Sequence, residues 1–101
     1  MIARVWHGVT PKSKREGHVR QIKKTGLKDF ARLKGNRGAY VFTRDYDEST
    51  EFLVISLWDS MDSIKAFAGD DMERSRYYPD DYKLLANLEP KVKHYRVEAK
   101  L

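Results

Sequence analysis

Residues 51–58, with the sequence EFLVISLW, form the most strand-like segment of this chain. Ser56 is the only polar residue between Phe52 and Trp58. A nearly continuous apolar run of this length is typical of a strand that is buried on both faces of its sheet. It is much shorter than the roughly 20 apolar residues that span a bilayer. We therefore expect this segment to lie inside a sheet that is covered on both sides.

The residues that follow this strand indicate a helix. Asp59 and Ser60 can cap its first turn, and apolar residues recur at helical spacing between Met61 and Ala68. Gly69 can then end it, because glycine readily adopts the backbone conformation found just after a helix. The sequence therefore predicts a helix packed against the strand.

Two short helices and a strand are expected after this point. Asp70 or Asp71 can begin the first helix, which would end near Tyr78 because Pro79 cannot continue it. A second helix would begin at Asp80 or Asp81 and carry Leu84, Leu85 and Leu88 on one face. Residues 92–98 predict the last strand.

The chain before residue 51 adds two strands and a helical region. Ser13 and Glu16 have the spacing of a capping box, and Gly26 interrupts the helix that they would begin. The expected elements are a strand over residues 2–7, a helix from about Ser13 to Gly26, a short helical piece or structured loop over 27–34, and a strand over 39–44 joined to residues 51–58 by a polar hairpin.

The order strand, helix, strand, strand, helices, strand predicts the fold class. Two split βαβ units of this kind form an α+β, ferredoxin-like βαββαβ domain with a four-stranded antiparallel sheet and helices on one face. The length of 101 residues suits a single domain over residues 1–101. The sheet face without helices would expose residues 52–58, so we expect a second sheet from another copy to cover it in a homodimer.

Composition and charge limit the function classes. The chain has no cysteine, which excludes disulfides, thiol catalysis and cysteine-ligated metals. No secretory signal pattern is visible, so we expect a cytoplasmic protein with no membrane partner. Residues 11–38 carry ten basic and two acidic residues, and residues 45–81 carry eleven acidic and three basic residues. The basic stretch fits a solvated helix face, and nucleic-acid binding is unlikely because Phe30 is the only aromatic residue between Lys12 and Arg37.

Three stretches resemble the antibiotic biosynthesis monooxygenase (ABM) family: LWDSMDSIKAFAGDD at 57–71, GNRGAYVF at 35–42 and VKHYRV at 92–97. The resemblance covers residues 1–98. It implies a homodimer of the dimeric α+β barrel type, in which each protomer keeps a pocket between its sheet and its helices. Some members of the family oxidise phenols or quinols with molecular oxygen and without a cofactor.

Haem-degrading relatives of this family use an asparagine on the first strand, a tryptophan on the second helix and a histidine ten residues after it. By this resemblance the tryptophan position falls on Phe67 and the histidine position on Tyr77, and the first strand has no asparagine. The resemblance therefore gives no support for a haem site.

Three residues are candidates for catalysis. His94 and His7 could remove a phenolic proton near neutral pH, and Tyr77 could hydrogen-bond a phenol or take its proton. The alternative is that both histidines are exposed or bonded locally and that Tyr77 packs in the core. We expect His18 to be exposed on the basic helix, and three scattered histidines give no metal-ligand spacing.

Five residues are candidates for substrate binding. Trp58, Phe67 and Tyr78 could form the walls of a pocket, with core packing as the alternative. Trp6 and Arg4 share one face of the first strand because side chains alternate along a strand. If that face points to the helices, Arg4 could bind an anionic or carbonyl group. If it points away, both residues belong to the dimer interface.

The leading functional hypothesis is a cofactor-independent monooxygenase, an oxidoreductase acting on a phenolic or quinol-like small molecule. The alternative is a non-catalytic dimeric module that binds a small apolar or aromatic molecule, since no catalytic constellation is forced by the residues. Ligand binding without oxygen uptake would favour the second hypothesis.

Overall fold

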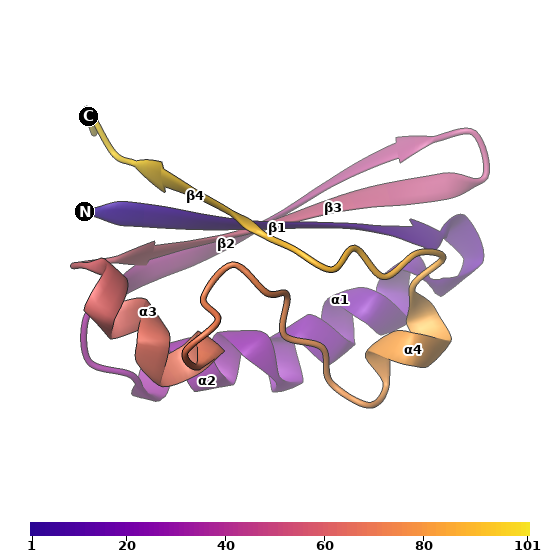
Figure 1. The fold of residues 1–101 in the computed structure, drawn as a ribbon. Coiled ribbons are helices and arrows are strands. Elements are labelled where there is room, and N and C mark those ends of the chain that lie inside the picture. The colour runs from indigo at the N-terminus through magenta and orange to yellow at the C-terminus, as the bar shows by residue number, and fades with distance from the viewer.

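The computed structural model describes residues 1–101 as a four-stranded sheet with helices packed on one face (Figure 1). The elements are β1 (Ile2–Pro11), a 3-10 turn (Lys12–Lys14), α1 (Arg15–Lys24), α2 (Gly26–Arg32), β2 (Asn36–Tyr46), β3 (Ser49–Trp58), α3 (Met61–Ala68), α4 (Asp81–Leu84) and β4 (Lys93–Arg96). The α+β fold class that the sequence predicts is confirmed.

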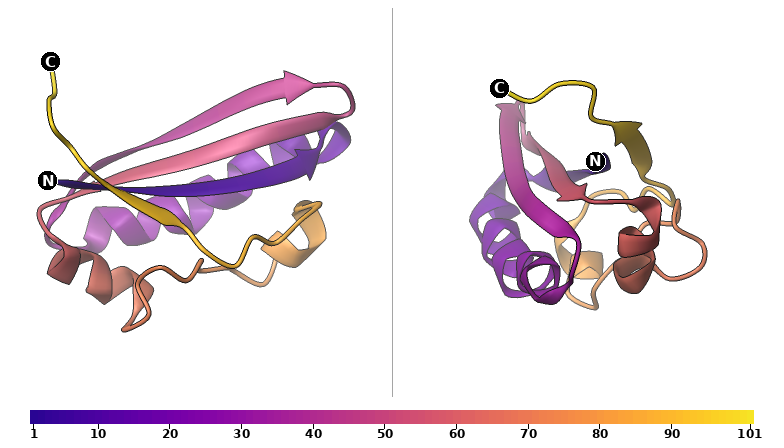
Figure 2. Two further views of the ribbon diagram at one scale, coloured as in Figure 1. Left: turned by 45° about the horizontal axis from the view of Figure 1, so that its top comes forward. Right: turned by 90° about the vertical axis from the view of Figure 1, so that its left-hand side faces the viewer.

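The sheet has the strand order β2-β3-β1-β4, and all its neighbouring strands are antiparallel. β3 and β1 are the two central strands, with Val5 opposite Ile55. β4 lies on the other side of β1, with His94 opposite Arg4. This is the ferredoxin-like arrangement, and all the helices lie on the same side of the sheet in each view (Figures 1 and 2).

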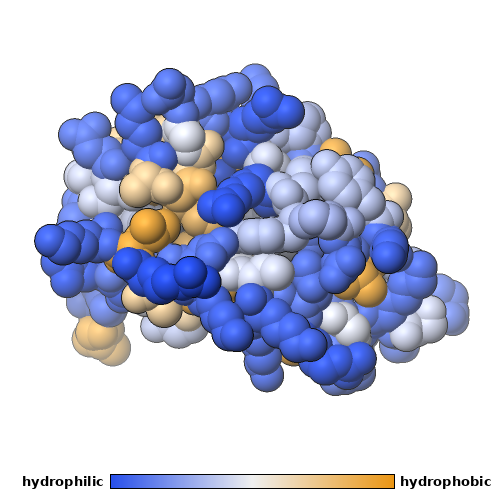
Figure 3. All heavy atoms as spheres, turned by 90° about the horizontal axis from the view of Figure 1, so that it is seen from below, coloured by the Kyte–Doolittle hydropathy of each residue, from blue (hydrophilic) through white to orange (hydrophobic).

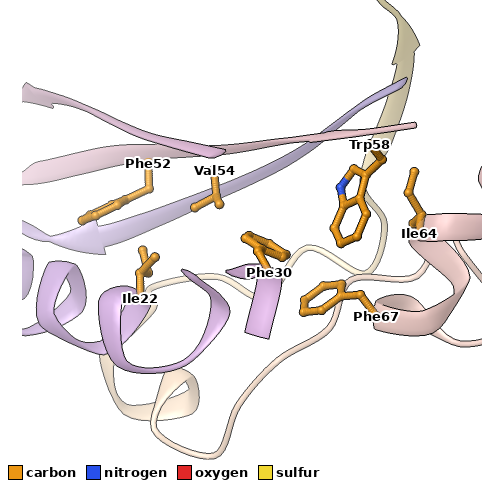
Figure 4. Packing of buried hydrophobic residues seen from close by; sticks show 7 residues of the cluster. All are labelled: Ile22, Phe30, Phe52, Val54, Trp58, Ile64 and Phe67. Carbon is orange, nitrogen blue, oxygen red and sulfur yellow. The ribbon is translucent and has the colours of Figure 1, made fainter. Parts of the chain in front are cut away.

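Side chains of β3 alternate between the two faces of the sheet. Residues 50, 52, 54, 56 and 58 are buried, and the residues between them are only half-buried. The buried side chains meet α1, α2 and α3 in one core (Figure 4), which consists of Ile22, Phe30, Phe52, Val54, Trp58, Ile64 and Phe67. Within one chain, helices therefore cover one face of β3, and no element covers the other.

The helix after β3 forms as its local sequence predicts. The Ser60 side chain accepts a hydrogen bond from the backbone N–H of Ser63 at 3.3 Å and so caps the first turn of α3. Gly69 ends the helix with φ +82°, a conformation that other residues rarely adopt. Its apolar residues Ile64 and Phe67 point into the core.

The predicted helix start at Ser13 is wrong. β1 extends to Pro11, opposite Ser49, and the backbone N–H of Lys12 donates to the carbonyl of Glu48 at 2.8 Å. Because these contacts hold the chain against the β2–β3 hairpin, residues 12–14 form a 3-10 turn and α1 begins only at Arg15, without a side-chain cap. The helical piece predicted beyond Gly26 is present as α2.

The helix predicted over residues 70–78 is absent. Residues 70–80, which we call the strap, run as turns and extended chain across the helical side. The strap is tied to the segment before β4 by the N–H of Ser75, which donates to Pro90 at 2.9 Å, and by the N–H of Val92, which donates to Glu73 at 2.8 Å. These long-range bonds replace the local bonds of a helix.

The helix predicted beyond Asp80 is a single turn, α4. The N–H of Ala86 donates to the carbonyl of Val9 at 2.7 Å, and Asn87 forms an isolated bridge with the same residue of β1. Pairing with β1 therefore pulls the chain out of the helix after Leu84. No helix in the structure is both long and apolar enough to cross a membrane.

Gly8 is required by the packing of Trp6. A Cβ atom at Gly8 would lie 2.3 Å from Cη2 of Trp6, whereas a Cβ atom at Gly17 in α1 would meet only ordinary contacts, the nearest at 3.6 Å. We predict that Gly8→Ala destabilises the protein by about 1–3 kcal/mol through overpacking. Gly17→Ala should stabilise it by up to about 1 kcal/mol, because alanine favours a helix. Urea unfolding of both variants tests this, and equal stabilities would contradict the packing of Trp6.

Candidate functional site

A cavity of about 60 Å³ lies between the helical face of the sheet and the elements that cover it. β1 and β3 form its floor, α1, α2 and α3 form its sides, and the strap contributes to its rim. Its wall is formed by Arg4, Trp6, His18, Ile22, Thr25, Gly26, Phe30, Val54, Ser56, Phe67, Arg76, Tyr78, Asp81 and Val92. Seen from the helical side, the surrounding surface is mainly hydrophilic, with hydrophobic residues in small groups (Figure 3).

Phe67 is the central aromatic residue of the wall. Its ring lies 4.7 Å from the ring of Phe30 and 6.3 Å from that of Trp58, measured between ring centres (Figure 4). Two guanidinium groups lie over it, those of Arg76 at 4.7 Å and Arg4 at 5.8 Å from the ring centre. Such contacts between a cation and a ring face are attractive. The cavity therefore combines an apolar wall with positive charge.

Arg4 is a buried cation without a carboxylate partner. Only 3% of its surface is exposed. Nη2 donates to the carbonyl of Arg74 at 3.0 Å, while Nη1 donates to the carbonyl of Met72 and lies 3.1 Å from Nε2 of His94. No acidic side chain pairs with it, and burial lowers its pKa to about 10, so it is still charged at neutral pH.

His18 is a neutral base in the cavity wall. It is 1% exposed, and burial lowers its pKa to about 4. Nδ1 is 2.8 Å from the hydroxyl of Thr10, and Nε2 is 3.9 Å from Oδ1 of Asp81, which is too long for a hydrogen bond. Burial also raises the pKa of Asp81, whose Oδ2 accepts the N–H of Tyr78 at 2.7 Å. Nε2 therefore has no hydrogen-bond partner in the protein.

Arg76 and Tyr78 hold the strap against α2 and α3. The guanidinium of Arg76 donates to the carbonyl of Phe67 at 3.1 Å and lies 3.5 Å from the carboxylate of Asp29. It also lies over the ring of Tyr78, at 5.1 Å from its centre, and the hydroxyl of Tyr78 donates to Asp29. Burial raises the pKa of that hydroxyl, so Tyr78 is not a base at neutral pH.

A wider groove of about 680 Å³ lies outside the strap. Arg76 lines both the cavity and this groove, so its side chain stands between them. The groove is otherwise lined by Ala68, Asp71, Arg74, Ser75, Tyr77, Tyr82, Pro90 and Lys91. No group of three or more acidic, histidine or cysteine side chains is placed to hold a metal ion.

Four of the five residues predicted to bind substrate line the cavity. Arg4 and Trp6 point to the helical side of β1, which settles the choice that the sequence left open, and Phe67 and Tyr78 complete the set. Trp58 does not line the cavity. It is fully buried in the core, and its indole N–H donates to the hydroxyl of Ser56 at 2.8 Å. A role in substrate binding stays a prediction for all five.

None of the three predicted catalytic residues lines the cavity. His7 lies on the uncovered face of the sheet. Burial alone would lower its pKa, but hydrogen bonds to Glu89 and to Glu51, the latter at 2.8 Å, raise it. Nε2 of His94 lies 3.1 Å from Nη1 of Arg4. The hydroxyl of Tyr77 donates to the backbone carbonyl of Glu89. Their catalytic roles stay predictions that this geometry does not support.

Sequence reasoning missed His18, Arg76 and Asp81. The prediction that His18 is exposed is wrong, because its side chain is enclosed by Trp6 and Phe52. A signal was available, since His18 precedes the apolar Ile22 by four residues and therefore shares its helix face. The many basic residues around it obscured that signal. Arg76 and Asp81 reach the cavity only through the path of the strap, which no local pattern predicts.

Solved structures with this arrangement include the following three. A proposed antibiotic biosynthesis monooxygenase from Bacillus cereus is 14% identical with a TM-score of 0.67, and covers 99% of this chain and 95% of its own. A second, from Deinococcus radiodurans, is 13% identical with a TM-score of 0.61, and covers 100% of this chain and 96% of its own. This chain has their fold. A conserved protein from Methanosarcina mazei Go1 is 14% identical with a TM-score of 0.62, and covers 95% of this chain and 92% of its own.

The TM-scores and coverage establish the shared ABM-like fold over nearly the whole chain, and at 13–14% identity the likeness extends to the fold alone. No protein-family model matches the sequence. No curated protein matches it either.

Burial of His18 predicts a specific dependence of stability on pH. The unfolded chain binds a proton at His18 near pH 6.5, whereas the folded chain binds it only near pH 4. The contribution of His18 to the free energy of unfolding is therefore fully present above pH 6.5 and is lost as the pH falls towards 4. The loss is about 3 kcal/mol at most. We predict that urea unfolding of His18→Gln shows a smaller loss over this range than the unsubstituted protein. Parallel pH profiles would contradict a buried, neutral His18.

Proposed function

We propose that this chain is a cofactor-independent oxygenase of a phenolic or quinol-like small molecule, which binds in the cavity between sheet and helices. The observation that carries the proposal is an aromatic cavity in which a buried cation, Arg4, and a neutral base, His18, both line the wall. The fold shared with two proteins that are named as proposed antibiotic biosynthesis monooxygenases supports it.

The reaction requires only the substrate and molecular oxygen. With 1-naphthol as an example, the base takes the phenolic proton and the phenolate gives one electron to oxygen. The two radicals then combine to form a C–O bond at the carbon opposite the hydroxyl. The peroxide takes a proton and becomes a hydroperoxide. Its O–O bond then breaks, the outer OH leaves with the hydrogen of the same ring carbon as one water molecule, and the inner oxygen stays as the second carbonyl of the quinone. One oxygen atom ends in the product and the other in water.

The residues of the cavity suit the charge changes of this reaction. Arg4 favours the phenolate over the phenol, because a cation stabilises a nearby anion in a medium from which water is excluded. Nε2 of His18 can take the phenolic proton and return it to the peroxide once the negative charge of the bound phenolate offsets the burial that lowers the pKa of His18 to about 4. Asp81, with Oδ1 at 3.9 Å, faces the imidazolium that forms meanwhile. The rings of Phe67 and Trp6 provide apolar walls.

The size of the cavity requires the strap to move. An apolar cavity of about 150 Å³ holds one benzene molecule, and this cavity has about 60 Å³. A phenol therefore enters only when Arg76 and Tyr78 swing away from Phe67 and Asp29, which joins the cavity to the groove outside the strap. Closure after binding excludes water from the reacting atoms.

Activity should depend on His18 and not on the histidine of the opposite face. We predict that His18→Gln lowers the rate of oxygen consumption with 1-naphthol at least 100-fold, because the general base is lost. His7→Gln, the same substitution outside the cavity, should change it less than twofold. An oxygen electrode and the absorbance of the quinone measure this. Equal rates in His18→Gln and the unsubstituted protein would remove His18 from the mechanism.

We also propose that two copies associate through the uncovered face of the sheet. That face carries Tyr40, Phe42 and Tyr95, which are 52%, 49% and 52% exposed, beside the half-buried Leu53 and Ile55. Large apolar side chains gathered on one face favour association. A second sheet on this face would complete the cover that β3 lacks and would give the dimeric α+β barrel.

The dimer gives a prediction that light scattering can test. Phe42→Glu should weaken association at least 100-fold and give monomers at micromolar concentration, because it places a charge among apolar residues. Tyr82→Glu is the matched control, since Tyr82 is 64% exposed on α4 on the helical side. A monomeric unsubstituted protein at micromolar concentration would contradict the dimer.

A non-catalytic binding module of the same fold is the second candidate. The small cavity favours it, as does the position of all three sequence-predicted catalytic residues outside the wall. This candidate predicts that small aromatic molecules raise the melting temperature without any consumption of oxygen. The oxygenase predicts both effects with the same compound.

A further inference from the structure

We propose that the ligand of the cavity carries a carboxylate group and that Arg4 binds it through two parallel hydrogen bonds. This inference rests on the proposed function only in placing the ligand in this cavity, and it extends that function by naming the substrate class, an aromatic carboxylic acid. The carboxylate of such a ligand would take the position next to Arg4 that a simple phenol gives to its phenolate oxygen. It concerns binding and holds for an oxygenase or for a binding module.

The hydrogen bonds of Arg4 leave one edge of its guanidinium free. Nη1 is engaged by Met72 and His94, and Nη2 donates to Arg74. A guanidinium has five N–H donors, so Nε–H and the second N–H of Nη2 have no partner. Together these two can form the side-on edge that binds both oxygens of a carboxylate. The donors already in use hold the group in place for this contact.

The charge balance of the cavity also favours an anion. Arg4 pairs with no acidic side chain, whereas the carboxylate of Asp29, next to Arg76, lies outside the cavity wall. Asp81 is the one acidic residue of the wall, and it is directed towards His18 and the N–H of Tyr78. A buried charge without an oppositely charged partner is costly, so a ligand carboxylate would offset the energetic cost of burying Arg4.

The shape of the site suggests how an aromatic acid would lie. The cavity of about 60 Å³ has room for a carboxylate group at its floor, where Arg4 rises from β1. The ring would then lie against Phe67, between the guanidinium groups of Arg4 and Arg76, after the strap has moved. Both groups already lie over the ring of Phe67, so the aromatic ring of a ligand would replace part of their contact with Phe67.

Binding of benzoate and of benzyl alcohol tests this inference. The two probes have nearly the same shape, and only benzoate is charged. Titration calorimetry at pH 7.5 should give at least tenfold tighter binding of benzoate to the unsubstituted protein. Arg4→Gln should weaken benzoate binding at least tenfold and leave benzyl alcohol unchanged. Arg4→Lys should also weaken it, because lysine keeps the charge and loses the planar fork.

Arg37→Gln is the matched control, because Arg37 is exposed and pairs with Asp59 away from the cavity. It should bind benzoate like the unsubstituted protein. Equal affinity of the unsubstituted protein for both probes, or no affinity for benzoate, would overturn the inference even if Arg4→Gln fails to fold. Benzoate binding that depends on Arg4, without oxygen uptake from hydroxybenzoates or naphthols, would support the inference and reject the oxygenase. Oxygen uptake from neutral phenols, with no tighter binding of carboxylates, would support the oxygenase and reject the inference.

Discussion

Burial of every second side chain of β3 under the helices is the constraint on which the rest of the structure depends. Phe52, Val54 and Trp58 hold α1, α2 and α3 against the sheet, and Ser56 between them satisfies the indole of Trp58. A strand has two faces, so the same alternation places Leu53 and Ile55 on the side without helices. The core, the cavity and the surface available to a second copy all follow from this alternation of side chains between the two faces of the sheet.

The cavity exists because the helical layer does not close over β1 as it does over β3. Arg4, Trp6 and Gly8 occupy the helical face of β1, where a fully apolar strand would place three aliphatic side chains. A buried guanidinium and a buried imidazole cost folding free energy there, and hydrogen bonds to Met72, Arg74 and Thr10 offset part of it. Polar residues that cost stability in a cavity wall are typical of a site with a function.

The sequence predicted those parts of the molecule that short-range physics decides. Ser60 and Gly69 set the ends of α3 through contacts within one turn, and the apolar run of residues 52–58 set a central strand of the sheet. The failures lie where distant segments compete with local preference. The hydrogen bond from Ser75 to Pro90 helps to replace one predicted helix, and the bond from Ala86 to Val9 shortens another to the single turn α4. The cavity wall draws on the same long-range contacts, which is why Arg4 and Trp6 could be proposed and Arg76 and Asp81 could not.

The sparse backbone bonding of the strap has a consequence for kinetics. Between residues 70 and 80 the backbone is anchored by few hydrogen bonds to the rest of the chain, whereas the β1–β3 ladder runs over the full length of both strands. The free energy needed to detach the strap is therefore a small part of that needed to unfold the sheet. Exchange of ligand with solvent would then be set by this local detachment, and substitutions that weaken the core could lower the melting temperature while leaving the residence time of a ligand unchanged.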